Sequence, residues 1–104
     1  MIQTTGVAAP DALTPAKERR LDALERARQD AWLKLYDEVR ALPWQENVLI
    51  GDQLTIDPRA RARVLNYIWN AEVLDQRYDP DEEMAEVTIA VEIAGLSPLI
   101  SSPY

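Results

Sequence analysis

The chain lacks cysteine, histidine and phenylalanine altogether, and it has only three glycines among 104 residues. Without cysteine it forms no disulfide and offers neither a thiolate nucleophile nor a thiolate metal ligand. Without histidine it lacks the commonest general base, the commonest metal ligand and the usual pH switch. The aromatic part of the core must therefore come from three tryptophans and four tyrosines.

Long hydrophobic runs are absent too, and none approaches the ~20 residues that span a bilayer. Residues 1–15, MIQTTGVAAPDALTP, have neither the basic start nor the sustained apolar centre of a secretory signal peptide. The glycines, Gly6, Gly51 and Gly95, are too scattered to form a phosphate-binding loop. We expect no membrane-spanning segment, and a cytoplasmic protein if Met1 is the true start.

Acidic residues dominate the charge of the chain. Eighteen of them against eleven basic residues give a net charge of −7. Phosphate backbones repel such a chain, so we expect no nucleic-acid partner. Apolar residues make up 47% of the sequence, which is enough for one folded domain with a single modest core.

Helical periodicity is clearest over residues 14–42, between a capping Thr14-Pro15 pair and the terminating Pro43. A helix of this length would span roughly 42 Å, which exceeds a small core, so we expect it to lie across a sheet or reach another subunit. Its apolar stripe is Leu24, Ala27, Ala31, Leu35, Val39 and Leu42, widened by Leu21, Trp32 and Tyr36. A second helix is predicted over residues 57–70, with Ala60, Val64 and Ile68 buried.

Alternating apolar residues predict strands over residues 47–56, 71–79 and 84–96, and MIQTTGV at the start is a candidate edge strand. The predicted fold class is α+β, with the order (β)-α-β-α-β-β. A small, mostly antiparallel sheet of three or four strands is covered on one face by one long and one short helix. We assign 1–13 to an N-terminal strand and linker, 14–96 to the single domain, and 97–104 to an extended or mobile tail.

No residue pattern in the chain predicts a catalytic or cofactor-binding site, and we expect neither enzymatic activity nor a cofactor. The acidic run DPDEE supplies weak metal candidates, but it lacks the calcium-loop spacing, and we favour a hydrated hairpin turn without metal. These candidates are Asp79, Asp81, Glu82 and Glu83.

Protein–protein contact is better supported by the residue types. Trp44, which follows a helix-ending proline, is expected to be the most exposed tryptophan and an interface anchor. Arg59 and Arg63 lie one helical turn apart and could bind one acidic group, although ordinary surface arginines are favoured. The outward side of the last strand, with Thr88, Ala90 and Glu92, suits either water or a neighbouring subunit.

Three segments carry a resemblance to a known family. Residues 5–39 (TGVAAPDALTPAKERRLDALERARQDAWLKLYDEV), residues 61–79 (RARVLNYIWNAEVLDQRYD) and residues 85–96 (AEVTIAVEIAGL) resemble the LPP-twenty lipoprotein family, which includes flagellar-envelope FlgP-type proteins. The matching positions are Ala23, Ala27, Asp30, Ala31, Leu35, Arg63, Val64, Ala71 and Val73. The resemblance implies a non-enzymatic protein of the outer membrane or flagellar base that assembles with copies of itself.

We therefore expect a self-associating structural or assembly protein of the bacterial cell envelope, in the periplasm or at the outer membrane. Its partners would be copies of itself or envelope and flagellar proteins. A lipid anchor is expected only if a processed N-terminal region precedes this chain. The alternative is a cytosolic acidic module that engages a basic site on a partner protein.

Overall fold

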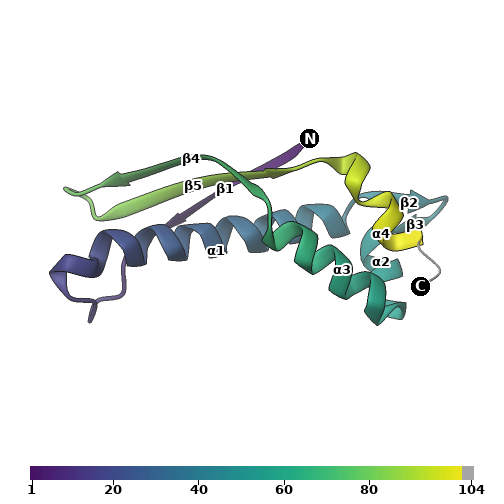
Figure 1. The fold of residues 1–104 in the computed structure, drawn as a ribbon, viewed down its shortest axis with the longest axis horizontal. Helices are drawn as coiled ribbons and strands as arrows, with labels where there is room; N and C mark the ends of the chain where they lie inside the picture. Colours follow the sequence, from purple (N-terminus) through teal and green to yellow (C-terminus); the bar gives the residue numbers. More distant parts are fainter. Residues whose placement is uncertain (102–104) are drawn as a thin grey trace.

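The structure, a computed structural model, describes residues 1–101. Two short 3₁₀ turns, η1 and η2, accompany helices and strands that form an α+β domain (Figure 1). In chain order the elements are β1 (Ile2–Ala8), η1 (Ala16–Glu18), α1 (Arg19–Arg40), β2 (Pro43–Gln45), β3 (Val48–Leu49), α2 (Ile50–Ile56), α3 (Pro58–Trp69), β4 (Glu72–Asp79), β5 (Met84–Val91), η2 (Ile93–Gly95) and α4 (Ser97–Ser101).

The main sheet has three antiparallel strands in the order β1-β5-β4, so the final strand lies in the middle. Helix α1 runs beneath one face of this sheet, as Figure 1 shows, and no helix of the described residues covers the opposite face. The alternation over residues 84–91 fits this arrangement. Val87, Ile89 and Val91 turn toward α1 and are buried. The predicted fold class is thus confirmed.

Small residues let β1 and α1 approach unusually closely. Ala23, Ala27 and Ala31 follow one another at four-residue steps on α1 and are fully buried. Gly6 of β1 lies against them, and a Cβ there would overlap the backbone of Ala27 and come within 2.9 Å of the Ala31 Cα. The buried Thr4 hydroxyl donates to the Ala31 carbonyl at 2.7 Å. Strand and helix therefore pack backbone to backbone.

Larger side chains fill the other end of the molecule, where α2 and α3 pack against α1 and α4 packs on α3 (Figure 1). There the stripe of α1 continues with Leu35 and Val39. The molecule measures 49 × 22 × 20 Å, and its radius of gyration is 16.0 Å. A compact domain of this length has about 13 Å. The chain is thus elongated, and one continuous core runs along α1 from the sheet to the smaller helices.

The strand predicted over residues 47–56 is wrong, because only Val48–Leu49 are extended and helix α2 follows. Ile50 and Leu54 are the buried residues, and their four-residue spacing is that of a helix. Asp52, which interrupts the alternation, accepts a hydrogen bond from the Leu49 N–H at 3.0 Å and holds the start of α2. The remaining apolar member of the alternation, Ile56, is exposed.

Helix α1 begins at Arg19, not at Thr14, and its 22 residues span about 33 Å. Thr14 donates its hydroxyl to Asp22 at 3.0 Å, so it does not cap the helix N-terminus. Leu21, expected to widen the buried stripe, is 71% exposed. Helix α3 begins after a capping Asp57 and buries the three residues predicted for it.

The chain after β5 is also more ordered than predicted. The last strand ends at Val91, and residues 97–101 form α4 where an extended or mobile tail was expected. Leu96 and Ile100, four residues apart, are buried and anchor this helix. Two apolar positions were too few to reveal a helix by periodicity. The rest of the predicted tail, 102–104, lies outside the described residues.

Candidate interaction site

The outer sheet face is polar, and it is the face that the long helix leaves open. The strand register places three rows across it, each row crossing β1, β5 and β4 in turn. On the central strand β5, two residues of these rows offer little to a partner. The Thr88 hydroxyl shares a 2.8 Å hydrogen bond with Thr5, and Ala90 is only 3% exposed to solvent. The rows are Gln3–Ala90–Glu72, Thr5–Thr88–Asp75 and Val7–Glu86–Arg77.

The free edge of β1 is closed by side chains of α1. The Val7 N–H donates to the Asp30 carboxylate at 3.0 Å, and Lys34 donates to the Thr5 carbonyl at 3.2 Å. Asp30 and Lys34 also form an ion pair at 2.9 Å. One outward N–H and one outward C=O of β1 are therefore already bonded to α1, and helix side chains cover this edge, which is one way to protect an edge strand from pairing.

Among residues 1–101, nothing protects the free edge of β4 in this way. Backbone groups of successive residues in an antiparallel strand point to opposite neighbours. On β1, Val7 and Thr5 direct their backbone groups away from the sheet, and their partners on β5 are Glu86 and Thr88. The N–H and C=O groups of Glu86 and Thr88 therefore point away from β1, toward β4. There they meet Arg77 and Asp75. The backbone groups of these two β4 residues are thus used inside the sheet.

Gln76 and Tyr78 consequently direct their backbone groups away from the sheet. Within residues 1–101, no other strand pairs with this edge, and no side chain bonds to it. A β-bulge between Val73 and Asp75 interrupts the strand near its start. The segment available for pairing is therefore 74–79.

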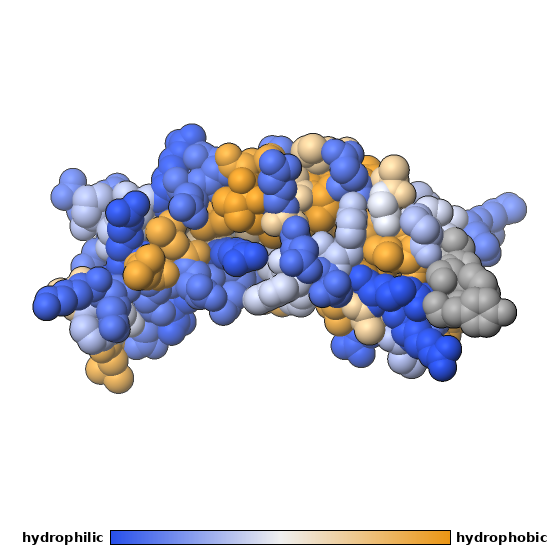
Figure 2. Space-filling model, in the orientation of Figure 1, coloured by the Kyte–Doolittle hydropathy of each residue, from blue (hydrophilic) through white to orange (hydrophobic). Residues whose placement is uncertain are grey.

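Apolar side chains accompany this open edge. Val73 is 42% exposed and Leu74 is 44% exposed, and Trp69 at the end of α3 is 48% exposed. Figure 2 shows hydrophobic colour across the middle of the molecule, where β4 lies above α1 in Figure 1. Exposed apolar surface beside unpaired backbone is the composition expected of a surface that another chain covers.

Trp69, and not Trp44, is the most exposed tryptophan. Trp44 lies in β2, is half-buried and packs against the core, so its predicted exposure is wrong. Trp69 makes an edge-to-face contact with Trp32 at 5.5 Å, and the Arg28 guanidinium lies 5.6 Å from its ring centre. This cluster fixes the junction between α1 and α3 from which β4 emerges.

The two arginines singled out on α3 have separate environments. Arg63 is half-buried, and its Nε donates to the Leu99 carbonyl at 2.7 Å, which ties α4 to α3. Arg59 is exposed at the start of the helix. Glu92 is also exposed, and its carbonyl accepts a hydrogen bond from the Tyr67 hydroxyl at 2.9 Å. These contacts are structural, and they do not bring the three residues together.

The acidic turn between β4 and β5 is organised by its own hydrogen bonds. The Asp79 carboxylate accepts from the N–H groups of Asp81 and Glu82 at 2.9 and 3.4 Å. Glu83 forms an ion pair with Arg19 at 2.6 Å, which lowers the pKa of Glu83 and raises that of Arg19. In residues 1–101 no three acidic side chains gather closely enough to hold a metal ion.

Sequence reasoning missed the residues of the β4 edge, chiefly Asp75, Gln76, Arg77 and Tyr78. Residues 71–79 were predicted as a strand, but an edge strand and a central strand of weak pattern look alike in sequence. One signal was available, since mixed charges on both sides of Gln76 suit a strand exposed on both faces.

Comparison with protein-family models, curated proteins and solved structures found no match to this chain. None of the helices in residues 1–101 is both long and apolar enough to cross a membrane. The β4 edge thus stands on its geometry alone as the candidate interaction site.

Proposed function

We propose that the protein is a non-catalytic structural or assembly protein whose subunits join through the free edge of β4. The observation that carries this proposal is the contrast between the two sheet edges. Asp30 and Lys34 bond an outward N–H and an outward C=O of β1, whereas the outward groups of Gln76 and Tyr78 on β4 have no partner in the described chain. A second copy of β4 supplies the missing strand.

Antiparallel pairing of two β4 strands fits best when it is centred on Gln76. The two Gln76 residues then exchange backbone hydrogen bonds, because both direct these groups outward. Asp75 of each copy faces Arg77 of the other, and Leu74 lies near Tyr78 of the other. Opposite charges placed directly across a strand pair stabilise it. The result is a six-stranded sheet, β1-β5-β4-β4-β5-β1.

Neighbouring registers are disfavoured by charge. Centring the pair on Arg77 places two arginines face to face, and centring it on Asp75 places two aspartates face to face. Like charges directly opposite each other destabilise a strand pair. The order of residues in β4 therefore selects one self-complementary register, as a two-fold dimer requires.

The paired segment is short, so the dimer should be weak. Contacts of a few residues a side fall below the ~1,200 Å² of standard stable interfaces. We expect a dissociation constant of about 0.1–1 mM. Sedimentation velocity from about 10 µM to about 1 mM protein should show a monomer–dimer equilibrium. A single monomeric species across this range would refute self-association.

The resemblance to LPP-twenty lipoproteins supports the bacterial cell envelope as the place of assembly, with outer-membrane or flagellar proteins as further partners. Fractionation of cells that express the full gene tests this location. If the protein is instead an acidic module for a basic partner, the purified chain should stay monomeric and bind only when that partner is added.

A further inference from the structure

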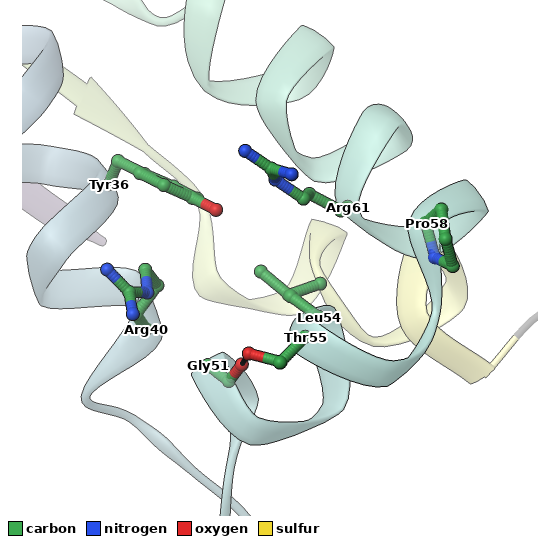
Figure 3. Close-up of a pocket in the computed structure, with 7 residues that line it drawn as sticks. All are labelled: Tyr36, Arg40, Gly51, Leu54, Thr55, Pro58 and Arg61. Atoms are coloured by element: carbon green, nitrogen blue, oxygen red, sulfur yellow. Dashed lines mark hydrogen bonds between the residues drawn. The ribbon is translucent and has the colours of Figure 1, made fainter.

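A cavity of about 300 Å³ opens between α1, α2 and α3, at the end of the molecule away from the acidic turn. Its walls are formed by Tyr36, Arg40, Gly51, Leu54, Thr55, Pro58 and Arg61 (Figure 3). These residues include two arginines and no carboxylate. A positively lined cavity is unexpected in a chain whose net charge is −7.

Two hydrogen-bonding groups face each other across this cavity, and the Arg40 guanidinium lies at its side. In Figure 3 the Tyr36 hydroxyl and the Arg61 guanidinium point toward one another across its upper side, and Arg40 lies beneath Tyr36. The absence of a side chain at Gly51 leaves room for Arg40, because a Cβ at this position would lie 3.1 Å from the Arg40 Cβ and 3.4 Å from the Arg40 Nε. The hydroxyl of Thr55 already donates to the Gly51 carbonyl at 2.8 Å.

Both cavity arginines have guanidinium N–H groups that no close acceptor among residues 1–101 occupies, unlike most arginines of this chain. Arg61 makes no side-chain hydrogen bond or ion pair with any residue of 1–101. Arg40 has only a loose pair with Asp37 at 3.8 Å and stacks on Tyr36, with its guanidinium 5.6 Å from the ring centre. By contrast, Arg19 holds Glu83 in a two-pronged pair.

We propose that this cavity binds a small phosphate monoester. The Arg61 guanidinium and the Tyr36 hydroxyl match the acceptor oxygens of a phosphate dianion, the charge of Arg40 beside Tyr36 adds to the attraction, and an arginine fork binds phosphate in two-pronged fashion. Leu54, Pro58 and the Tyr36 ring form an apolar wall for the ester group. The volume is at the lower end for ligand sites, so the ligand is small.

The test is an NMR titration of the uniformly labelled protein at constant ionic strength with phenyl phosphate, inorganic phosphate, benzoate and chloride. Phenyl phosphate should give saturable shifts at Tyr36, Gly51, Thr55 and Arg61. Inorganic phosphate should bind more weakly because it leaves the apolar wall uncovered. Benzoate binding as tightly as phenyl phosphate, or shifts that do not saturate, would overturn the proposal.

Two matched arginine variants test whether phenyl phosphate binds in this cavity. Arg61→Gln should weaken phenyl phosphate binding about tenfold or more, since it removes a charged hydrogen-bond partner. Arg59→Gln is the control, because it makes the same charge change on the same helix but does not line the cavity. An unchanged Tm in both variants shows that the fold is retained. Equal weakening by both variants would overturn the site.

The cavity and the β4 edge share no residue, so the two proposals fail separately. Phosphate binding by a strictly monomeric protein would refute only the proposed function. A dimer that ignores phenyl phosphate would refute only the cavity site.

Discussion

The two edges of the three-stranded sheet differ in how their backbone groups are satisfied. The β1 edge lies against α1, where Asp30 bonds the outward N–H of Val7 and Lys34 bonds the outward C=O of Thr5. Strand β4 is exposed along most of its length, and the groups of Gln76 and Tyr78 at its edge have no partner within residues 1–101. One small sheet thus has a closed edge that stabilises the fold and an open edge that is available to another chain.

Close packing explains why the closed edge is on β1. Gly6 and the alanine stripe bring this strand close enough to α1 for polar side chains of the helix to reach its edge. Helix α1 cannot lie as close to both edges of a sheet at once. The fold therefore leaves β4 exposed on both of its faces along most of its length.

The largest expected effect concerns the closed edge. Gly6→Ala should destabilise the protein by more than about 3 kcal/mol, because the added methyl group overlaps helix backbone that cannot move aside. Urea denaturation measures the change. Thr5→Ala on the same strand is the control and should cost less than about 1 kcal/mol, since its hydroxyl bond to Thr88 lies on the exposed face. A Gly6→Ala variant as stable as this control would show that β1 and α1 are not in close contact.

The next effect concerns the open edge. Gln76→Pro should raise the dimer dissociation constant about tenfold or more, because it removes an outward N–H that pairs with the second copy. Its own sheet should survive, since proline is tolerated on an edge strand where the N–H faces solvent.

The matched control is Gln76→Ala, which keeps the backbone N–H and should keep the dimer. Sedimentation gives the association, and circular dichroism verifies the fold. If the proline variant still dimerises as the wild type does, the β4 edge is not the interface.

A smaller effect is expected when the closed edge loses its hydrogen-bond acceptor. Asp30→Ala should cost about 0.5–1.5 kcal/mol, because the Val7 N–H is exposed and water replaces the carboxylate. Asp37→Ala, on the same helix and only loosely paired with Arg40, should change the stability by less than about 0.5 kcal/mol. Similar losses in urea denaturation for the two variants would show that Asp30 does not close the edge.

The smallest effect is on pH dependence. Hydrogen bonds from Lys34 and from the Val7 N–H lower the pKa of Asp30 below its ordinary value. A carboxylate with a lowered pKa stabilises the fold above its unfolded-state pKa, and this stabilisation is lost as the pH falls through the folded-state value. Asp30→Asn should therefore show a slightly smaller fall in Tm than the wild type when the pH drops from neutral to below 4. A larger fall in the variant would contradict this role of Asp30. The effect is small because the side chain is more than one-third exposed.

The sequence predicted the fold class and those helices and strands that bury the apolar side chains of one face and expose the other. Helix α3 with its Asp57 cap and the alternating row of β5 are both confirmed, because each buries one regular face. Residues 47–56 were misread because Asp52 looked like an interruption in a strand, whereas it caps a helix.

Tertiary arrangement explains what the sequence could not predict about the candidate sites. The open edge of β4 follows from the strand order, and the mixed charges around Gln76 indicate an exposed strand but not which neighbours it has. The arginine cavity is lined by Arg40 of α1 and Arg61 of α3, and their spacing along the chain does not indicate that they line one cavity.

The central claim is that β4 pairs with β4 of a second copy in the register centred on Gln76, and charge reversal tests it most directly. Asp75→Arg and Arg77→Asp should each remain monomeric alone, because each places like charges opposite one another. An equimolar mixture of the two should sediment as a heterodimer, since every facing pair is then opposite in charge. A mixture that stays monomeric while the wild type dimerises would contradict this register.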